Sequence, residues 1–189
     1  MRNYALMYEY NMYGVFIQGI SGELYTVDEW SNQETANGVA VITERNSFVI
    51  AKQNYINMAF GSGPEIVPNA FYSEDENIAK TDKYGVLNTR YLVNSGVMYP
   101  AASGANDYEF PNGSSGYLPA LGELMIVSEN YDAVQSALSA IGSGFGNNNA
   151  YWSSTQYDLS YAWAAVPATG SVSEYPKSTE CYIRPFTTL

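Results

Sequence analysis

The chain has 189 residues, with 19 Asp and Glu against 8 Lys and Arg, no His, and a net charge of −11. This length suits one domain, and the acidic balance excludes a basic surface for nucleic acid or anionic membranes. Without His there is no His-based acid–base catalysis and no His metal site. Cys181 stands alone, so an internal disulfide and a cysteine zinc site are excluded as well.

Within residues 1–12, large apolar side chains recur at every second position, at Tyr4, Leu6, Tyr8 and Tyr10. This predicts a strand or an extended arm that packs on a neighbouring subunit or on the domain itself. We therefore expect an arm for oligomerisation or attachment over 1–12 and one domain over 13–189. The first residues contain no apolar segment or cleavage site typical of a signal peptide, and no run reaches membrane-spanning length.

Strands dominate the region that follows. Residues 14–26 read as two short strands with a turn at Ser21-Gly22, and "DEW" at 28–30 reads as a helical turn after Thr26. The segment "GVAVITERNSFVIA", residues 38–51, alternates on both sides of a polar centre and predicts a hairpin.

Helices are expected in the middle of the chain. The acidic run 73–77 is either a calcium loop or a solvated helix start, and its spacing matches no EF-hand, which favours the helix start. A helix is predicted over 81–96, because Leu87 and Tyr91 are four residues apart. A second begins near Pro119, and a third runs from about 130 to Gly142.

The last quarter returns to strands. After the Gly- and Asn-rich loop 142–150, strand-like pieces cover 150–157, 160–167 and 180–186, with 168–179 as a connection. Strands, helices and strands in this order predict an α+β fold with an antiparallel sheet. We expect the first and last strands to pair and close the domain.

The stretch "YWSSTQYDLSYAW", residues 151–163, has two interpretations. The 18 Tyr of the chain and the mixture of Tyr and Ser suit a binding face, because Tyr supplies rigid, amphipathic contact area. They also suit half-buried strands. Trp152 and Trp163 favour core positions, since large aromatic side chains dominate cores. Alternation would place Ser154 and Gln156 on the same side as Trp152.

Several motifs together carry a family resemblance: "GYLPALGE" (116–123), "YWSST" (151–155), "AW" (162–163) and "YIRPF" (182–186). They resemble a bacterial and phage group of C-type-lectin-fold domains. The group includes the Lcl-type C-terminal domain and the variable proteins of diversity-generating retroelements. "LYTVDEW" and the hairpin segment 38–51 resemble tail-fibre and adhesin-like members. The resemblance covers roughly residues 13–186.

The resemblance implies a C-type lectin fold, with two helices packed on a small twisted antiparallel sheet and both termini close together. It implies a framework that does not change between members: Trp152, Ser153, Ser154, Trp163, Gly170, Tyr182, Arg184 and Pro185. It also implies outward, ligand-binding positions on the last strands and their connections: Gln156, Asp158, Leu159, Tyr161, Val166, Ser171, Ser173, Glu174, Tyr175 and Glu180.

The chain departs from several members of this fold. It lacks Glu-Pro-Asn, Gln-Pro-Asp and Trp-Asn-Asp, which calcium-dependent sugar-binding lectins carry, and the single Cys181 does not match the fold's cysteine-dependent enzymes. No spacing singles out two carboxylates for glycoside cleavage. We expect neither catalysis nor a metal or cofactor, with Cys181 acting as a small hydrophobic side chain and Arg184 as a buried anchor.

Two functions remain open. One is a receptor-binding protein of a phage tail or related particle, made in the bacterial cytoplasm without a signal peptide and carried on the virion. The other is a bacterial surface adhesin or a structural fibre subunit. The expected partners are a cell-surface glycan or protein, tail or fibre proteins, and further copies of the chain, with a trimer favoured. Nucleic acid and membrane insertion are not expected.

Overall fold

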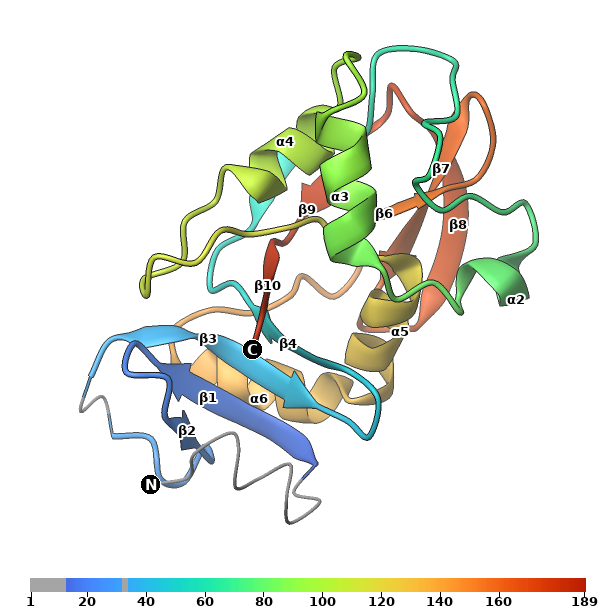
Figure 1. Cartoon of the computed structure of the whole chain (residues 1–189). Coiled ribbons are helices and arrows are strands. Elements are labelled where there is room, and N and C mark those ends of the chain that lie inside the picture. The colour runs from blue at the N-terminus through green and yellow to red at the C-terminus, as the bar shows by residue number, and fades with distance from the viewer. Residues whose placement is uncertain (1–12, 32–33) are drawn as a thin grey trace.

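The computed structural model describes residues 13–31 and 34–189, so the expected arm 1–12 lies outside the described residues. This part of the chain forms two five-stranded sheets and five helices (Figure 1). The α+β prediction is therefore confirmed. The expectation of two helices on one small sheet undercounts both the helices and the sheets. None of the described helices has the length and apolar character needed to cross a membrane.

The first sheet is built from the N-terminal strands and the C-terminal strand. Its strands are β1 (Gly14–Gly19), β2 (Leu24–Tyr25), β3 (Ala36–Ile42), β4 (Ser47–Ile50) and β10 (Phe186–Thr188). Their order is β10-β4-β3-β1-β2, and every neighbouring pair is antiparallel. Both predicted hairpins are confirmed. Among the described strands, β3 and β4 lie between β1 and β10, and the expected pairing of the chain's start with its end involves residues 1–12, which lie outside the described residues.

The second sheet carries the C-terminal strands. Its members are β5 (Tyr55–Ala59), β6 (Tyr151–Gln156), β7 (Tyr161–Val166), β8 (Ser171–Pro176) and β9 (Glu180–Ile183). Their order is β5-β9-β6-β7-β8, with β6 and β9 parallel and the other pairs antiparallel. The connection predicted over 168–179 contains β8. This strand lies at the sheet edge and exposes most of its residues, so it lacks the apolar pattern of a buried strand.

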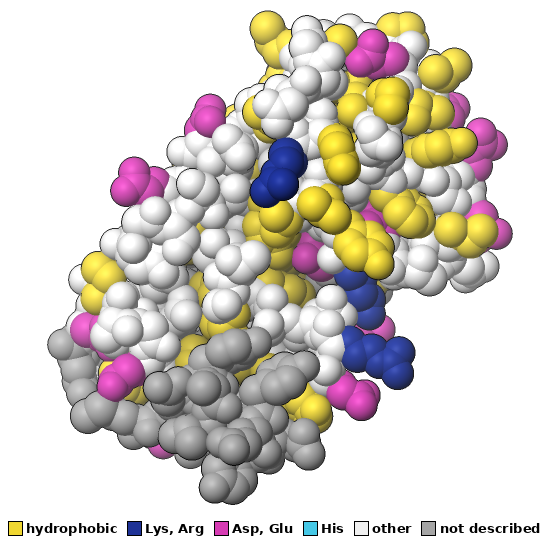
Figure 2. All heavy atoms as spheres, viewed as in Figure 1, with side chains coloured by type: hydrophobic (Ala, Val, Ile, Leu, Met, Phe, Trp, Pro, Cys, Tyr) yellow, Lys and Arg dark blue, Asp and Glu magenta, His cyan; other side chains and the backbone are white. Residues whose placement is uncertain are grey.

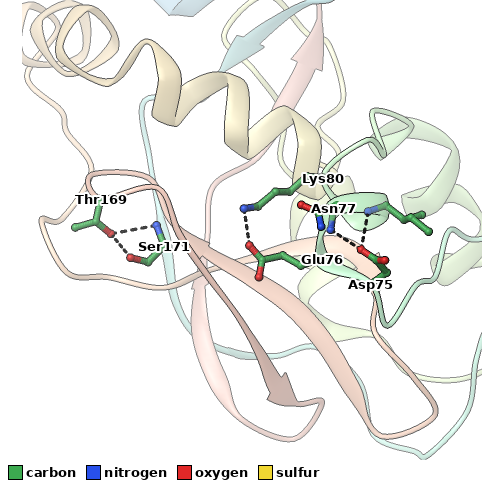
Figure 3. Close-up of polar contacts among 7 residues, drawn as sticks. Asp75, Glu76, Asn77, Lys80, Thr169 and Ser171 are labelled. Atoms are coloured by element: carbon green, nitrogen blue, oxygen red, sulfur yellow. Dashed lines mark hydrogen bonds and ion pairs between the residues drawn. The ribbon is translucent and has the colours of Figure 1, made fainter.

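Five helices lie between β5 and β6 in the chain: α2 (Glu76–Ala79), α3 (Gly85–Val93), α4 (Pro100–Asn106), α5 (Leu121–Glu129) and α6 (Tyr131–Ala140). Asp75 accepts hydrogen bonds from the backbone N–H groups of Asn77 and Ile78, so the acidic run is the predicted helix start (Figure 3). Helix α4 was not predicted from the sequence, because the residues it buries against the second sheet are alanines and form no large apolar stripe.

The core lies on both faces of the second sheet. On one face, Tyr151 and Trp163 pack with α5, α6 and the first sheet. On the other, Trp152 packs with α4, the end of α3 and Phe60. Every residue of β6 is therefore buried, and the strand is the spine of the domain.

Candidate functional site

The register of β7 and β8 divides the predicted ligand-binding positions between two faces of the sheet. Tyr161 lies opposite Pro176, and Trp163 lies opposite Glu174. Directly opposed residues share a face, and successive residues alternate between faces. Tyr161 and Glu174 therefore belong to the side of the sheet that carries Trp163.

Four other predicted positions belong to the opposite side. The register pairs Ala162 with Tyr175, and it places Ser173 and Ser171 two and four residues further along the same face, next to Val166. Tyr175 is half-buried and packs edge-on against Trp152, with ring centroids 6.1 Å apart. Glu180 lies on β9, opposite Ala59 of β5. The ten predicted positions thus do not form a single surface.

One compact surface does emerge at the start of the β7–β8 hairpin. We call it the Tyr161 face, and its residues are Glu74, Tyr157, Asp158, Leu159, Tyr161 and Glu174. The ring of Tyr157 lies 6.3 Å from that of Tyr161 and 5.0 Å from that of Trp163. Leu159 and Tyr161 expose 56% and 38% of their surface, so two large side chains are open to solvent at this turn.

Negative charge surrounds these rings. Partial burial, together with the charges of Glu174, Glu74 and Asp158, raises the pKa of Tyr157. Asp158 also shapes the turn, since one carboxylate oxygen accepts the N–H groups of Ser160 and Tyr161, both at 2.7 Å. The result is an acidic, tyrosine-rich surface on a rigid hairpin. Such a surface can bind a partner through aromatic contacts and charge.

A hollow of about 260 Å³ adjoins the Tyr161 face. It lies between segments 61–64, 160–161 and 176–178, so it brings together loops that are far apart in the sequence. Tyr161 and Lys177 are part of its lining, together with serine, glycine and proline residues.

Gln156, predicted as an outward position, is fully buried, and that prediction is wrong. Its Oε1 accepts the N–H of Val67 at 3.1 Å, and its Nε2 donates to the Val67 carbonyl at 3.4 Å. The side chain therefore fastens segment 61–68 to the end of β6. This role could not be predicted from the sequence, because residue type alone does not distinguish a buried glutamine that bonds backbone groups from an exposed one.

Lys177 was not singled out in the sequence, yet it supports the same loop. Its Nζ donates to the carbonyl of Glu65 and lies 3.4 Å from Oε1 of Gln156. The residue is only 3% exposed, and burial lowers its pKa to about 8. Lys177 therefore holds this loop from beneath and exposes little of its surface at the hollow.

Six of the eight predicted framework positions are buried, and Gly170 and Tyr182 are partly exposed. Trp152 and Trp163 are 0% and 3% exposed, and their indole N–H groups donate to the carbonyls of Met58 and Ser73, both at 2.8 Å. Arg184 is also buried: it donates to Asn54 and Gly144, and its guanidinium lies over the ring of Phe145. Cys181 is buried too, and burial raises the pKa of its thiol to about 11.

Two buried carboxylates lie behind the sheet. Asp82 accepts hydrogen bonds from Asn88 and from the hydroxyl of Thr155, both at 2.7 Å. Glu123 accepts from the hydroxyl of Tyr117 at 3.0 Å and from the N–H of Ala120 at 2.7 Å. Burial raises the pKa of Asp82, and it raises that of Glu123 to about 8. Both groups are buried: Asp82 joins Asn88 of α3 to Thr155 of β6, whereas Glu123 joins the start of α5 to Tyr117. Across residues 13–31 and 34–189, no cluster of three His, Cys, Asp or Glu could hold a metal.

No protein-family model and no curated protein matches this chain. Among solved structures, the fold is similar to that of a fimbrial protein from Bacteroides ovatus, with a TM-score of 0.74 and 12% sequence identity. The match covers 94% of this chain and 49% of that chain, so this chain spans about half the length of the fimbrial protein. At this identity the likeness shows the shared fold alone.

Proposed function

We propose that this chain is a contact domain of a bacterial surface fibre, serving as an adhesin or as a structural subunit, and that the Tyr161 face is its binding surface. The observation that carries the proposal is this exposed, acidic, tyrosine-rich face on a fold similar to a fimbrial protein. A rigid sheet that presents aromatic side chains at a turn binds with little loss of conformational entropy.

Receptor binding on a phage tail, the first function expected from the sequence, stays a prediction. Receptor binding would use the same surface and the same aromatic and acidic side chains, so the Tyr161 face fits both functions equally well. The fimbrial likeness favours the fibre. The C-type lectin fold and a diversified binding face belong to the same proposal as expectations from the sequence motifs. Genes for tail proteins beside the gene for this chain would favour the phage particle, and a pilus operon would favour the fibre.

The test is adhesion of beads coated with the purified protein to bacterial cells, mucin and matrix proteins. Tyr161→Ala and Leu159→Ala remove the exposed apolar contacts without touching the core. If Tyr161 is a central anchor, its loss costs roughly 2 kcal/mol or more of binding energy, which is more than tenfold in affinity. Val27→Ala is the matched control, because Val27 is 37% exposed and lies by the first sheet. Adhesion that survives both Tyr161-face changes would place the binding surface elsewhere.

A further inference from the structure

A second exposed surface runs along α3. Tyr84, Leu87 and Tyr91 expose 60%, 42% and 37% of their surface. Their spacing of three and four residues aligns them on one side of the helix. Figure 2 shows hydrophobic side chains gathered over α3, in the upper half of the molecule. A hollow of about 180 Å³ opens beside Tyr84 and Leu87.

The exposed cations gather beside this row. Arg45, Lys80 and Lys83 line a hollow of about 470 Å³ together with Tyr84, and Arg90 lies on α3 itself. Lys80 is paired with Glu76 at 2.5 Å (Figure 3). Figure 2 shows Lys and Arg side chains, in dark blue, next to the hydrophobic band.

The rest of the described chain offers little positive charge. Lys177 and Arg184 are buried, and Lys52 is exposed on a different element, just after β4. Most of the exposed cations of the described chain therefore lie on one surface, although the whole chain has a net charge of −11. We call this surface the α3 face, and its residues are Arg45, Lys83, Tyr84, Leu87, Arg90 and Tyr91.

The α3 face and the Tyr161 face are complementary. The first combines exposed tyrosine and leucine with positive charge, and the second combines them with the carboxylates of Glu74, Asp158 and Glu174. Opposite potentials steer association and set its register, while aromatic and aliphatic side chains supply the contact energy. The α3 face supplies positive charge, and the Tyr161 face supplies the negative charge that pairs with it.

We propose that the α3 face binds the Tyr161 face of a second copy of this chain. The proposal rests on the proposed fibre function and names the partner of its binding surface. Because the two surfaces are made of different residues, the contact is head-to-tail, and a pair of subunits keeps one free α3 face and one free Tyr161 face. Such contacts propagate as a fibre, or close into a ring such as the expected trimer if the rotation per subunit allows it.

Charge reversal with complementation tests this contact. One variant carries Lys83→Glu and Arg90→Glu, and the other carries Glu74→Lys and Glu174→Lys. Each variant alone places like charges across the contact, so each is expected to self-associate at least tenfold more weakly than the unmodified protein in sedimentation or light scattering. An equimolar mixture of the two is expected to recover association, because each supplies the surface that the other has lost.

Matched controls are Lys52→Glu and Glu109→Lys, which change charge at exposed positions away from both surfaces. They are expected to associate like the unmodified chain. Leu159→Ser weakens the contact without a charge change, and melting curves establish that each variant is folded. Added salt should also weaken association, because it screens the exposed charges.

The outcomes separate the two proposals. Recovery of association in the mixture supports the head-to-tail contact. A monomeric unmodified protein, or a mixture no better than its components, overturns it. If adhesion to cells or matrix still depends on Tyr161 in that case, the fibre-domain function stands and its partner is a different molecule. If association recovers but adhesion is absent, the chain is a structural subunit.

Discussion

Trp152 and Tyr161 differ in what surrounds their rings. Trp152 is fully buried and contacts Phe60 and Tyr175 edge-on, whereas Tyr161 is 38% exposed. We predict that Trp152→Ala lowers the free energy of unfolding by roughly 3–5 kcal/mol. Tyr161→Ala should change it by no more than about 0.5 kcal/mol. Urea unfolding of both variants measures this, and a strongly destabilised Tyr161→Ala would contradict the assignment of Tyr161 to an exposed face.

Glu123 makes stability depend on pH. Its pKa is about 8 in the folded chain and near 4.5 when exposed to water, so the folded state keeps a proton that the unfolded state has lost between these values. Unfolding therefore releases a proton in this window, and rising pH favours the unfolded chain. The contribution is present in full below pH 4.5 and is lost as the pH rises through 8.

We therefore predict that the melting temperature falls by several degrees from pH 5 to pH 8. Glu123→Gln keeps the shape of the side chain and removes its titration, so the fall should become shallower. The dependence of melting temperature on pH that remains in this variant is attributed to Asp82, whose pKa is also raised by burial. Calorimetry at several pH values is the measurement, and identical slopes for the variant and the unmodified protein would refute the role of Glu123.

At the scale of elements, the end of β6 holds segment 61–68 in place. Gln156 bonds both backbone groups of Val67, and Val67 is itself only 3% exposed. Gln156→Ala leaves these groups unpaired in the interior, at a cost of roughly 1–3 kcal/mol. We expect faster hydrogen exchange at the Val67 amide as well. Ser173→Ala, at an exposed position of β8, is the control and should leave both measurements unchanged. Equal stability of the two variants would show that the loop is held by other contacts.

The edge strand β8 shows why some elements were not predicted from the sequence. A strand is recognised from sequence by its buried residues, and β8 has few. Helix α4 has the same difficulty, since its small buried residues carry little periodic signal. In contrast, the two hairpins of the first sheet and helices α5 and α6 were predicted near their actual positions, because each carries an apolar pattern of the right period between turn residues.

At the scale of the whole molecule, β10 joins the end of the chain to the first sheet. Phe186 is fully buried, stacks on Phe48 with ring centroids 4.7 Å apart, and faces Ile50 across the strand pair. We predict that removal of residues 186–189 destroys the single cooperative unfolding transition, because the first sheet loses an edge strand and the buried ring of Phe186. Thr188→Ala is exposed and should retain it. Calorimetry decides, and a truncated chain that still melts in one transition at the original temperature would exclude this role for β10.

Local sequence patterns correctly predict the α+β class, the hairpins, the main helices and the buried positions of Trp152, Trp163 and Arg184. These follow from local periodicity and from the preference of large aromatic side chains for the core. Only the tertiary structure decided which predicted contact positions share a surface. Cross-strand register placed Tyr161 and Glu174 together, sent Tyr175 and Ser173 to the opposite side, and buried Gln156 under a loop from far away in the chain. Register and long-range burial arise from contacts between distant segments, so no local pattern carries them.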